Sequence, residues 1–207
     1  MSEYKDYDWT EERGKEAHSY LYSDLKYLLG SKDSAILDVG CGNGLMANQL
    51  IKEGFDVYGT DGAASGIQIA NKVNPDRFYV QDLSSLDLPQ ELQNKSFNTI
   101  VSTEVIEHLY DPRRYVDFCK KILMEGGGGE IIISTPYHGY LKNLIISATG
   151  KMDTHFTVLW DGGHIKFWSR KTLTQLLEEF GFEIIVFRGS GRFPFLWKSM
   201  FIKARIS

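Results

Sequence analysis

The sequence has little cysteine and no long hydrophobic run, and both absences exclude whole classes of protein. Its two cysteines, Cys41 and Cys119, are far apart in a chain of 207 residues. A fold held together by several disulfides is therefore excluded, and a reducing compartment is favoured. No apolar stretch reaches the roughly 20 residues that span a bilayer, and the charged first residues lack the apolar core of a signal peptide. We expect a cytoplasmic protein without a transmembrane segment.

An excess of charge of one sign is also missing. The chain carries 23 basic and 27 acidic residues, for a formal net charge of −4. This balance gives no strong signal for nucleic-acid binding. A chain of this length can bury roughly 70% of its unfolded surface without a disulfide or metal to stabilise it. We expect one domain over residues 1–207, whose oligomeric state no pattern predicts.

What the sequence does have is an alternation of short apolar runs with amphipathic segments. The first run ends in glycines, and the helical pattern that follows it ends at Gly54. The strands that we expect are residues 35–39, 55–61, 78–80, 97–103, 130–135, 183–187 and 199–206. Strands that alternate with helices in this way predict an α/β fold, with a Rossmann-like, mostly parallel sheet and helices on both faces.

Two segments lie outside this alternation. The first, from about residue 9 to 29, has a helical pattern with Thr10 as its N-cap. The second, from about residue 136 to 160, follows a strand end and is expected to form a lid-like insertion over the ligand crevice. We interpret its apolar run, 141–148, as a buried lid helix, with docking to a membrane surface as the alternative. Its histidines, His138 and His155, are expected to be solvated.

A glycine turn joins the first strand to its helix. Gly40, Gly42 and Gly44 stand at alternate positions, where the backbone can approach a ligand closely and a helix N-terminus offers free N–H groups. A dinucleotide-binding turn would have its third glycine at position 45, which is leucine here. The pattern therefore tells against an NAD-dependent oxidoreductase.

Three carboxylates stand at successive strand ends. Asp38 lies near the end of the first strand, Asp61 ends the second, and Asp82 follows the third. In a parallel sheet these ends meet at one crevice. Asp61 comes 21 residues after Gly40 (61 − 40), close to the spacing of a carboxylate that accepts from a ribose diol.

These stretches resemble the cofactor motifs of class I S-adenosylmethionine-dependent methyltransferases. The resemblance lies in residues 36–44, 58–61 and 81–83. It implies a seven-stranded sheet whose last strand is inserted antiparallel, an enzyme, and S-adenosylmethionine as cofactor. By the same resemblance, the glycine turn faces the methionine and ribose portion, Asp61 binds the ribose hydroxyls, and Asp82 with the Leu83 amide contacts the adenine. The implied cofactor-binding residues are Asp38, Gly40, Cys41, Gly42, Gly44, Asp61, Gly62, Asp82, Leu83 and Thr103.

A second informative pattern, E-x-x-E-H, follows the fourth strand. If residues 104–109 are helical, Glu104, Glu107 and His108 share one helix face at the reaction end of the crevice. Two carboxylates and an imidazole can bind a divalent metal, or they can position His108 as a general base for a substrate hydroxyl. A purely structural role, in which Glu107 and His108 cap and solvate a short helix, stays open.

The E-x-x-E-H pattern resembles the ubiquinone-pathway O-methyltransferases and the small-RNA 3′-terminal 2′-O-methyltransferases. The resemblance implies Mg²⁺ or another divalent metal, and in the RNA enzymes a later histidine completes the site. His164 stands where that histidine would fall, so the candidate metal ligands are Glu104, Glu107, His108 and His164. The candidate catalytic residues are His108 and Glu107.

The cluster of acidic residues and histidines favours a reaction in which a hydroxyl loses a proton. We expect methylation of a small-molecule acceptor at oxygen: a phenol, a quinone precursor or a sugar. The alternatives are 2′-O-methylation of RNA, for which we find no basic binding region, and a protein that binds the cofactor without catalysis. The sequence keeps Asp61, Asp82 and the residues Glu104–His108, which argues against a protein that has lost catalysis. An enzyme is therefore favoured.

Overall fold

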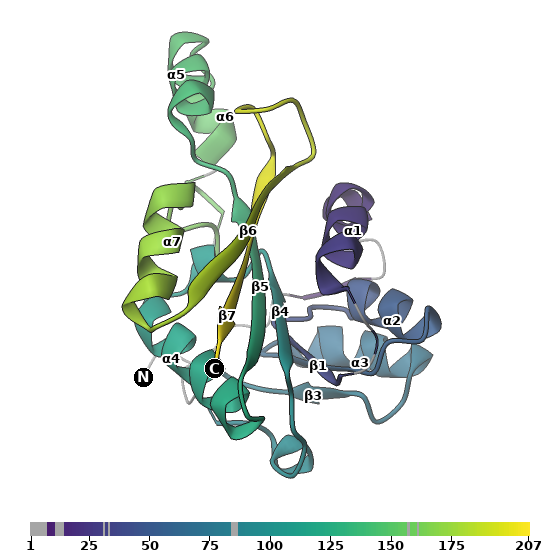
Figure 1. Ribbon diagram of the computed structural model, residues 1–207. Helices are drawn as coiled ribbons and strands as arrows, with labels where there is room; N and C mark the ends of the chain where they lie inside the picture. The colour runs from purple at the N-terminus through teal and green to yellow at the C-terminus, as the bar shows by residue number, and fades with distance from the viewer. Residues whose placement is uncertain are drawn as a thin grey trace.

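The computed structural model describes residues 8–10, 15–30, 32, 34–83, 87–156, 158–160 and 162–207. Its centre is a seven-stranded sheet with the strand order β3-β2-β1-β4-β5-β7-β6 (Figure 1). The strands are β1 (Ile36–Val39), β2 (Val57–Asp61), β3 (Phe78–Val80), β4 (Thr99–Thr103), β5 (Gly129–Pro136), β6 (Glu183–Ser190) and β7 (Ser199–Ile206). Strand β7 pairs antiparallel with both β5 and β6, and the other pairings are parallel. The predicted Rossmann-like sheet with a reversed last strand is confirmed.

Helices cover both faces of this sheet. They are α1 (Lys15–Leu29), α2 (Leu45–Lys52), α3 (Ala64–Val73), α4 (Pro112–Glu125), α5 (Tyr140–Ala148), α6 (Met152–Phe156) and α7 (Arg170–Glu179), with 3₁₀ turns η1 (Gln90–Leu92) and η2 (Ile106–His108). The first three helices pack on one face, and α4 and α7 pack on the other. Helices α5 and α6 project beyond the end of the sheet (Figure 1). None of the described helices is long and apolar enough to cross a membrane.

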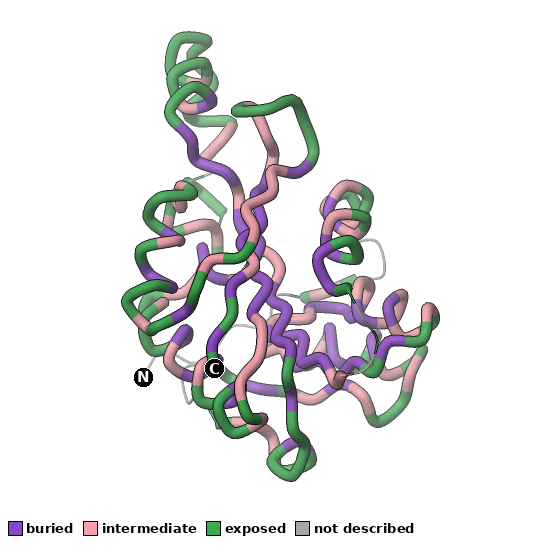
Figure 2. The backbone as a smooth tube through the Cα atoms, in the orientation of Figure 1, coloured by how far each residue is buried: buried purple, intermediate pink, exposed green. Residues whose placement is uncertain are grey.

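The central strands β1, β4 and β5 are rich in apolar residues because both of their faces are buried. In β5, Ile131 and Ile133 pack with α4 and α7, whereas Ile132 between them packs with α1. This alternation follows from the two-residue period of a strand. Figure 2 shows the buried residues concentrated along the central strands.

The strand register brings the carboxyl ends of neighbouring strands to one edge of the sheet. Val39 of β1 pairs with Thr60 of β2, and Asp61 pairs with Val80 of β3. Thr103 of β4 pairs with Ser134 of β5. The residues that follow these positions therefore lie at the same edge, where ligands bind in open parallel sheets.

The structure describes the predicted N-terminal helix (about 9–29) from Lys15 onward. Residues 11–14 lie outside the described part, α1 covers Lys15–Leu29, and Trp9 and Thr10 are not helical. Tertiary contacts fix Trp9 and Thr10, because the Trp9 N–H donates to Ser65 Oγ at 3.0 Å and the Thr10 carbonyl accepts from Asn43 Nδ2 at 2.9 Å. Trp9 and Thr10 are thereby held against the glycine turn and α3, and Thr10 as the helix N-cap stays a prediction, because residues 11–14 lie outside the described part.

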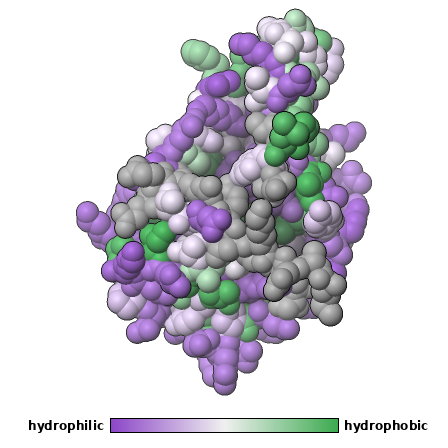
Figure 3. Space-filling model, turned by 180° about the vertical axis from the view of Figure 1, so that it is seen from behind, coloured by the Kyte–Doolittle hydropathy of each residue, from purple (hydrophilic) through white to green (hydrophobic). Residues whose placement is uncertain are grey.

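The prediction of a buried lid helix over residues 141–148 was also wrong. Only Lys142 is buried in α5, and Leu144 is 49% exposed. The view from behind shows a group of hydrophobic residues close below the projecting end of the molecule (Figure 3). His138, expected in solvent, is 8% exposed and stacks on Phe156, with a ring-centroid distance of 5.9 Å. The insertion therefore has a small aromatic core of its own.

Replacing Ser169 with alanine is expected to lower the free energy of unfolding by about 1 kcal/mol. The Thr172 N–H donates to Ser169 Oγ at 3.3 Å, and the Ser169 N–H donates to Thr172 Oγ1 at 3.0 Å. This capping box satisfies backbone donors that begin α7. Urea denaturation checks the prediction, with Ser147→Ala at the exposed end of α5 as control. Equal stability of the Ser169 variant and the wild type would contradict it.

Candidate active site

The glycine turn after β1 has the backbone conformations that its composition predicts. Gly40, Gly42 and Gly44 have φ angles of +80°, +56° and +71°, a region that favours glycine. The N–H groups of Gly40 and Cys41 both donate to the carbonyl of Thr60, at 2.7 and 2.9 Å. The turn is thereby fixed to the end of β2 before α2 begins at Leu45.

Asp61 at the end of β2 connects this turn to α3. Its Oδ2 accepts from the Gly42 N–H and its Oδ1 from the Ala63 N–H, both at 2.8 Å. Asp38 lies close by on β1 and is 3% exposed; its Oδ1 accepts no hydrogen bond from the described residues. Burial, followed by the charge of Asp61, raises the pKa of Asp38 to about 7. The two predicted carboxylates thus meet at one end of the sheet.

The remaining predicted cofactor residues lie at the same edge. Gly62 directly follows β2, and Thr103 ends β4. Asp82 and Leu83 follow β3; Asp82 is exposed, and Leu83 packs partly buried against the core. Cys41 turns toward β2, because a Cβ on Gly59 would lie 2.9 Å from Cys41 Sγ. Burial raises the pKa of the Cys41 thiol, so it stays protonated at neutral pH.

Two apolar side chains that the sequence did not single out pack against the glycine turn. A Cβ on Gly40 would clash with Val105, and a Cβ on Gly42 would lie 2.5 Å from the Trp9 ring. The glycines are therefore required by close packing within the protein as well as by their φ angles. No local pattern predicts these partners, because Trp9 and Val105 reach the turn only through the tertiary fold.

The expected helix over residues 104–109 is absent. Glu104 has a φ of +56°, and only Ile106–His108 forms a 3₁₀ turn. The Glu104 N–H donates to the carbonyl oxygen and hydroxyl of Ser134, at 3.1 and 3.2 Å, which extends the pairing of β4 with β5 by one residue. The chain must then turn sharply. Glu104 consequently does not share a helix face with Glu107 and His108, and that prediction was wrong.

Glu107, His108 and His164 do converge. Glu107 Oε1 lies 4.0 Å from His108 Nε2 and 3.9 Å from His164 Nε2, and the three ligand atoms all lie within 4.8 Å of one another. The segment that carries His164 is fixed here because the Ile165 and Lys166 N–H groups donate to the Glu107 carbonyl, at 2.9 and 3.0 Å. The histidine predicted from the later segment therefore reaches the cluster.

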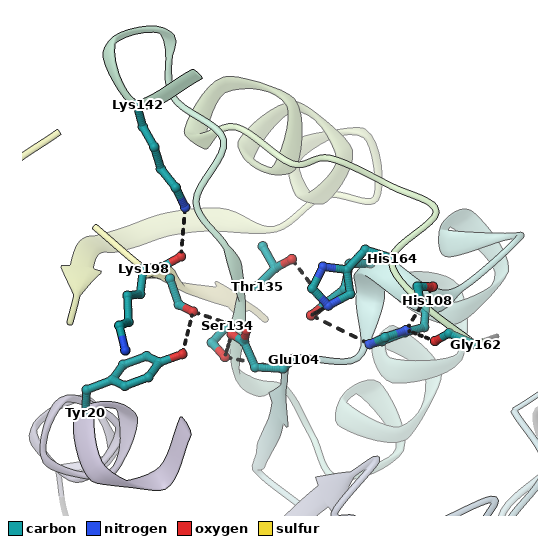
Figure 4. A network of polar contacts seen from close by, with 12 residues as sticks. Tyr20, Glu104, His108, Ser134, Thr135, Lys142, Gly162, His164 and Lys198 are labelled. Atoms are coloured by element: carbon teal, nitrogen blue, oxygen red, sulfur yellow. Dashed lines mark hydrogen bonds and ion pairs between the residues drawn. The ribbon is translucent and has the colours of Figure 1, made fainter. Parts of the chain in front are cut away.

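Hydrogen bonds orient these side chains. Glu107 is fully buried, and its Oε2 accepts from Thr135 Oγ1 at 3.0 Å, whereas its Oε1 has no hydrogen bond among the described residues. His108 Nδ1 lies 2.9 Å from the Gly162 carbonyl oxygen. A carbonyl can only accept, so Nδ1 carries the proton and the Nε2 lone pair of a neutral His108 faces Glu107. Figure 4 shows His108 beside Gly162, with His164 and Thr135 close by.

Burial determines the charge state of the cluster. It raises the pKa of the Glu107 carboxyl, with a further contribution from the charge of Glu104. It lowers the pKa of His108, and with neighbouring cations it lowers the pKa of His164 to about 4. Both imidazoles are therefore neutral at pH 7, and their lone pairs can accept a proton or bind a metal.

Glu104 belongs to a different polar network. Its Oε1 accepts from Ser134 Oγ at 2.8 Å and its Oε2 from Ser199 Oγ at 3.1 Å, while the hydroxyl of Tyr20 lies 3.5 Å from that of Ser199 (Figure 4). Burial raises the pKa of Glu104 to about 7. Tyr20 and Ser199 come from α1 and β7, so this side of the site could not be found from local spacing.

Comparison with known proteins identifies the family. Residues 13–186 match the family described as Methyltransferase domain, which is most of the chain. The chain is an S-adenosylmethionine-dependent methyltransferase of class I.

Curated relatives of this methyltransferase include ubiquinone biosynthesis O-methyltransferases. The one from Dinoroseobacter shibae is 29% identical over 178 residues, which cover 80% of this chain and 66% of the relative. The one from Coxiella burnetii is 28% identical over 194 residues, or 88% of this chain and 80% of the relative. Among the first relatives that it matches, the chain spans between 44% and 66% of their length.

Solved structures share the fold of the methyltransferase. The magnesium protoporphyrin IX methyltransferase of Synechocystis, solved with bound S-adenosylhomocysteine, superposes with a TM-score of 0.66 at 18% identity, over 93% of this chain and 83% of the other. A S-adenosylmethionine-dependent methyltransferase from Aquifex aeolicus gives a TM-score of 0.66 at 15% identity, over 95% of each chain. At such identities the likeness concerns the fold alone.

Proposed function

We propose that this methyltransferase transfers a methyl group to the oxygen of a small hydroxylated acceptor, such as a phenol, a quinone precursor or a sugar. One observation carries the proposal: Glu107 Oε1, a buried carboxylate oxygen without a hydrogen bond among the described residues, lies within about 4 Å of the Nε2 atoms of both His108 and His164. Such a group is suited to hold or remove the hydroxyl proton of an acceptor. The ubiquinone O-methyltransferases among the relatives support the same reaction class.

The residues at the glycine turn fit the cofactor. Asp38 Oδ1 is a buried carboxylate oxygen that lacks a donor among the described residues, and the ammonium group of a methionine moiety would supply one. Asp61 already accepts two backbone hydrogen bonds, and a carboxylate has capacity for further donors, such as ribose hydroxyls. The proposed cofactor-binding residues are Asp38, Gly40, Cys41, Gly42, Gly44, Asp61, Gly62, Asp82, Leu83 and Thr103.

When bound, S-adenosylmethionine supplies a methyl group that its sulfonium already activates. The protein then has to align the acceptor oxygen, exclude water and remove one proton. Glu107 is fully buried and the rings of His108 and His164 are partly buried, so their positions are fixed by packing. In this proposal Glu107 orients the acceptor hydroxyl, and His108 Nε2 accepts its proton.

The same three residues fit a divalent metal. Two neutral imidazoles and one carboxylate are common ligands of transition metals, and ligand atoms bound at about 2.1 Å lie roughly 3.4 Å apart in a tetrahedral site. The separations of 3.9 and 4.0 Å require only a small contraction. A metal held by Glu107, His108 and His164 would lower the pKa of the acceptor hydroxyl. Glu104 leaves the proposed ligand set because its carboxylate faces Ser134 and Ser199.

Turnover with a matched set of acceptors tests the proposal. The protein is incubated with S-adenosylmethionine and either catechol, thiophenol or aniline, and S-adenosylhomocysteine and the methylated product are quantified by mass spectrometry. We expect product with catechol above the background without acceptor. Methylation of aniline or thiophenol but not of catechol would contradict transfer to oxygen, and no product with any acceptor would contradict this class of small aromatic acceptor.

A further inference from the structure

Lys142 is a buried cation in a helix that is otherwise exposed. It lies on α5, yet its side chain is only 7% exposed and turns back toward the body of the protein (Figure 4). Its ammonium donates one hydrogen bond, to the main-chain carbonyl of Lys198, at 3.3 Å. An ammonium has three N–H donors. Among the described residues, Lys142 is therefore only partly satisfied.

A second cation belongs to the loop that Lys142 contacts. Arg192, between β6 and β7, makes no hydrogen bond or ion pair with the described residues, and the same loop ends at Lys198, whose carbonyl accepts from Lys142. Burial and Arg192 together lower the pKa of Lys142 to about 8. His138 and His155, with ring centroids 5.7 Å apart, lie in the same insertion as Lys142, and burial lowers the pKa of both, so they are neutral at pH 7. Lys142 and Arg192 are thus the two cations of this group, and they come from segments that are distant in sequence.

The carboxylates that face this group are engaged elsewhere. Glu16 pairs with Lys198 at 2.7 Å. Glu104 attracts Lys142 electrostatically, but its two oxygens accept from the hydroxyls of Ser134 and Ser199 instead. Neither Lys142 nor Arg192 has a carboxylate within ion-pair distance among the described residues. A buried cation such as Lys142 without an anionic partner is unfavourable, because it has lost its hydration.

We propose that Lys142 and Arg192 bind an anionic group, a carboxylate or a phosphate, on the methyl acceptor. The inference rests on the proposed transfer to a small acceptor and names the chemical class of that acceptor. Lys142 donates to the carbonyl of Lys198, the neighbour of Ser199, whose hydroxyl donates to Glu104, and Glu104 precedes the Glu107–His108–His164 cluster in the chain. An acceptor with its hydroxyl at that cluster and its anion at Lys142 would occupy the space between them. A guanidinium such as Arg192 recognises both anions through paired N–H donors.

Binding of small probes tests this subsite without turnover. Calorimetry measures the affinity of benzoate, phenyl phosphate and neutral benzamide for the protein saturated with S-adenosylhomocysteine. We expect at least one anion to bind about tenfold or more tightly than benzamide, as expected for charged hydrogen bonds. The anion preferred distinguishes an acceptor carboxylate from an acceptor phosphate.

Two neutral variants locate the effect. Lys142→Met and Arg192→Gln should each weaken anion binding about tenfold and leave the affinity for benzamide and S-adenosylhomocysteine unchanged. Lys151→Met is the matched control, because Lys151 is an exposed lysine between α5 and α6. Arg192 lies in an exposed loop, so its variant tests the proposal even if Lys142→Met does not fold.

Three results would overturn the inference. They are equal affinity for benzoate, phenyl phosphate and benzamide, undiminished anion binding in both variants, and an equal loss in Lys151→Met. If Lys142→Met lowers the melting temperature but leaves anion binding unchanged, Lys142 serves only to stabilise the packing of α5 against Lys198. Turnover of catechol together with failed anion binding would refute this inference and leave the proposed function standing. Anion binding without turnover of any acceptor would contradict the proposed function and leave the anion-binding subsite standing.

Discussion

Replacing Asp61 with alanine is expected to weaken the binding of S-adenosylmethionine by about 10- to 100-fold. The carboxylate holds the Gly42 and Ala63 N–H groups at 2.8 Å, and we propose that it also accepts from the ribose hydroxyls. Hydrogen bonds to a charged group contribute roughly 1.5–3 kcal/mol, which corresponds to this loss of affinity. The variant removes both the ligand's acceptor and the link that fixes the glycine turn.

Calorimetry with S-adenosylmethionine measures this effect, and Asp56→Ala is the matched control. Asp56 precedes the opposite end of β2, where it forms an ion pair with Arg77 at the surface. Its replacement should leave cofactor affinity unchanged. Thermal unfolding of both variants shows whether the fold persists. If the Asp61 variant is folded and binds S-adenosylmethionine as tightly as the wild type, Asp61 has no part in the cofactor site.

The edge of the sheet that carries the glycine turn could be predicted because its signals are local. A buried strand, glycines at Gly40, Gly42 and Gly44, and a helix follow one another within some twenty residues, and each is dictated by backbone chemistry. The parallel sheet then brings Asp38 and Asp61 to one edge without further information. The conformation of the glycine turn and the sheet order follow from the alternation of strands and helices.

The surroundings of Glu104 could not be predicted in the same way, because tertiary contacts override local spacing there. Glu104 and Glu107 have helical spacing, but the Glu104 N–H continues the pairing with β5 and leaves its side chain facing Ser199. The apolar run of α5 predicts a nonpolar helix face, but the run alone does not show whether that face is buried against the protein or exposed. Lys142, Tyr20 and Ser199 enter the site from three different elements, and no periodicity connects them.

The largest effect on rate is expected from His108. Replacing it with alanine should lower the rate of methyl transfer by about 10²–10⁴-fold if it accepts the hydroxyl proton. Burial lowers the pKa of His108, so the ring is neutral at pH 7 and becomes protonated only in more acidic solution. A base must be neutral to act, so wild-type activity should be constant near pH 7 and fall as the pH drops through the lowered pKa of His108.

A metal at the same three residues predicts a different set of results. Activity should then require an added divalent ion and fall with a chelator, and Glu107→Gln should lose metal affinity because an amide is a poorer ligand than a carboxylate. Glu104→Gln is the matched control, since the Glu104 carboxylate accepts from Ser134 and Ser199 instead of facing the two histidines. It should leave metal affinity unchanged.

Chelator and variants together separate these roles. Wild-type activity that is insensitive to chelator, combined with a slow His108→Ala variant, assigns His108 as the base. Loss of activity with chelator, restored by a divalent ion in the wild type but not in Glu107→Gln, assigns Glu107 as a metal ligand. Full activity of the double variant Glu107→Gln, His108→Ala in the presence of chelator would contradict both roles. Glu107 would then serve the fold, through its hydrogen bond with Thr135 and the two amides that its carbonyl binds.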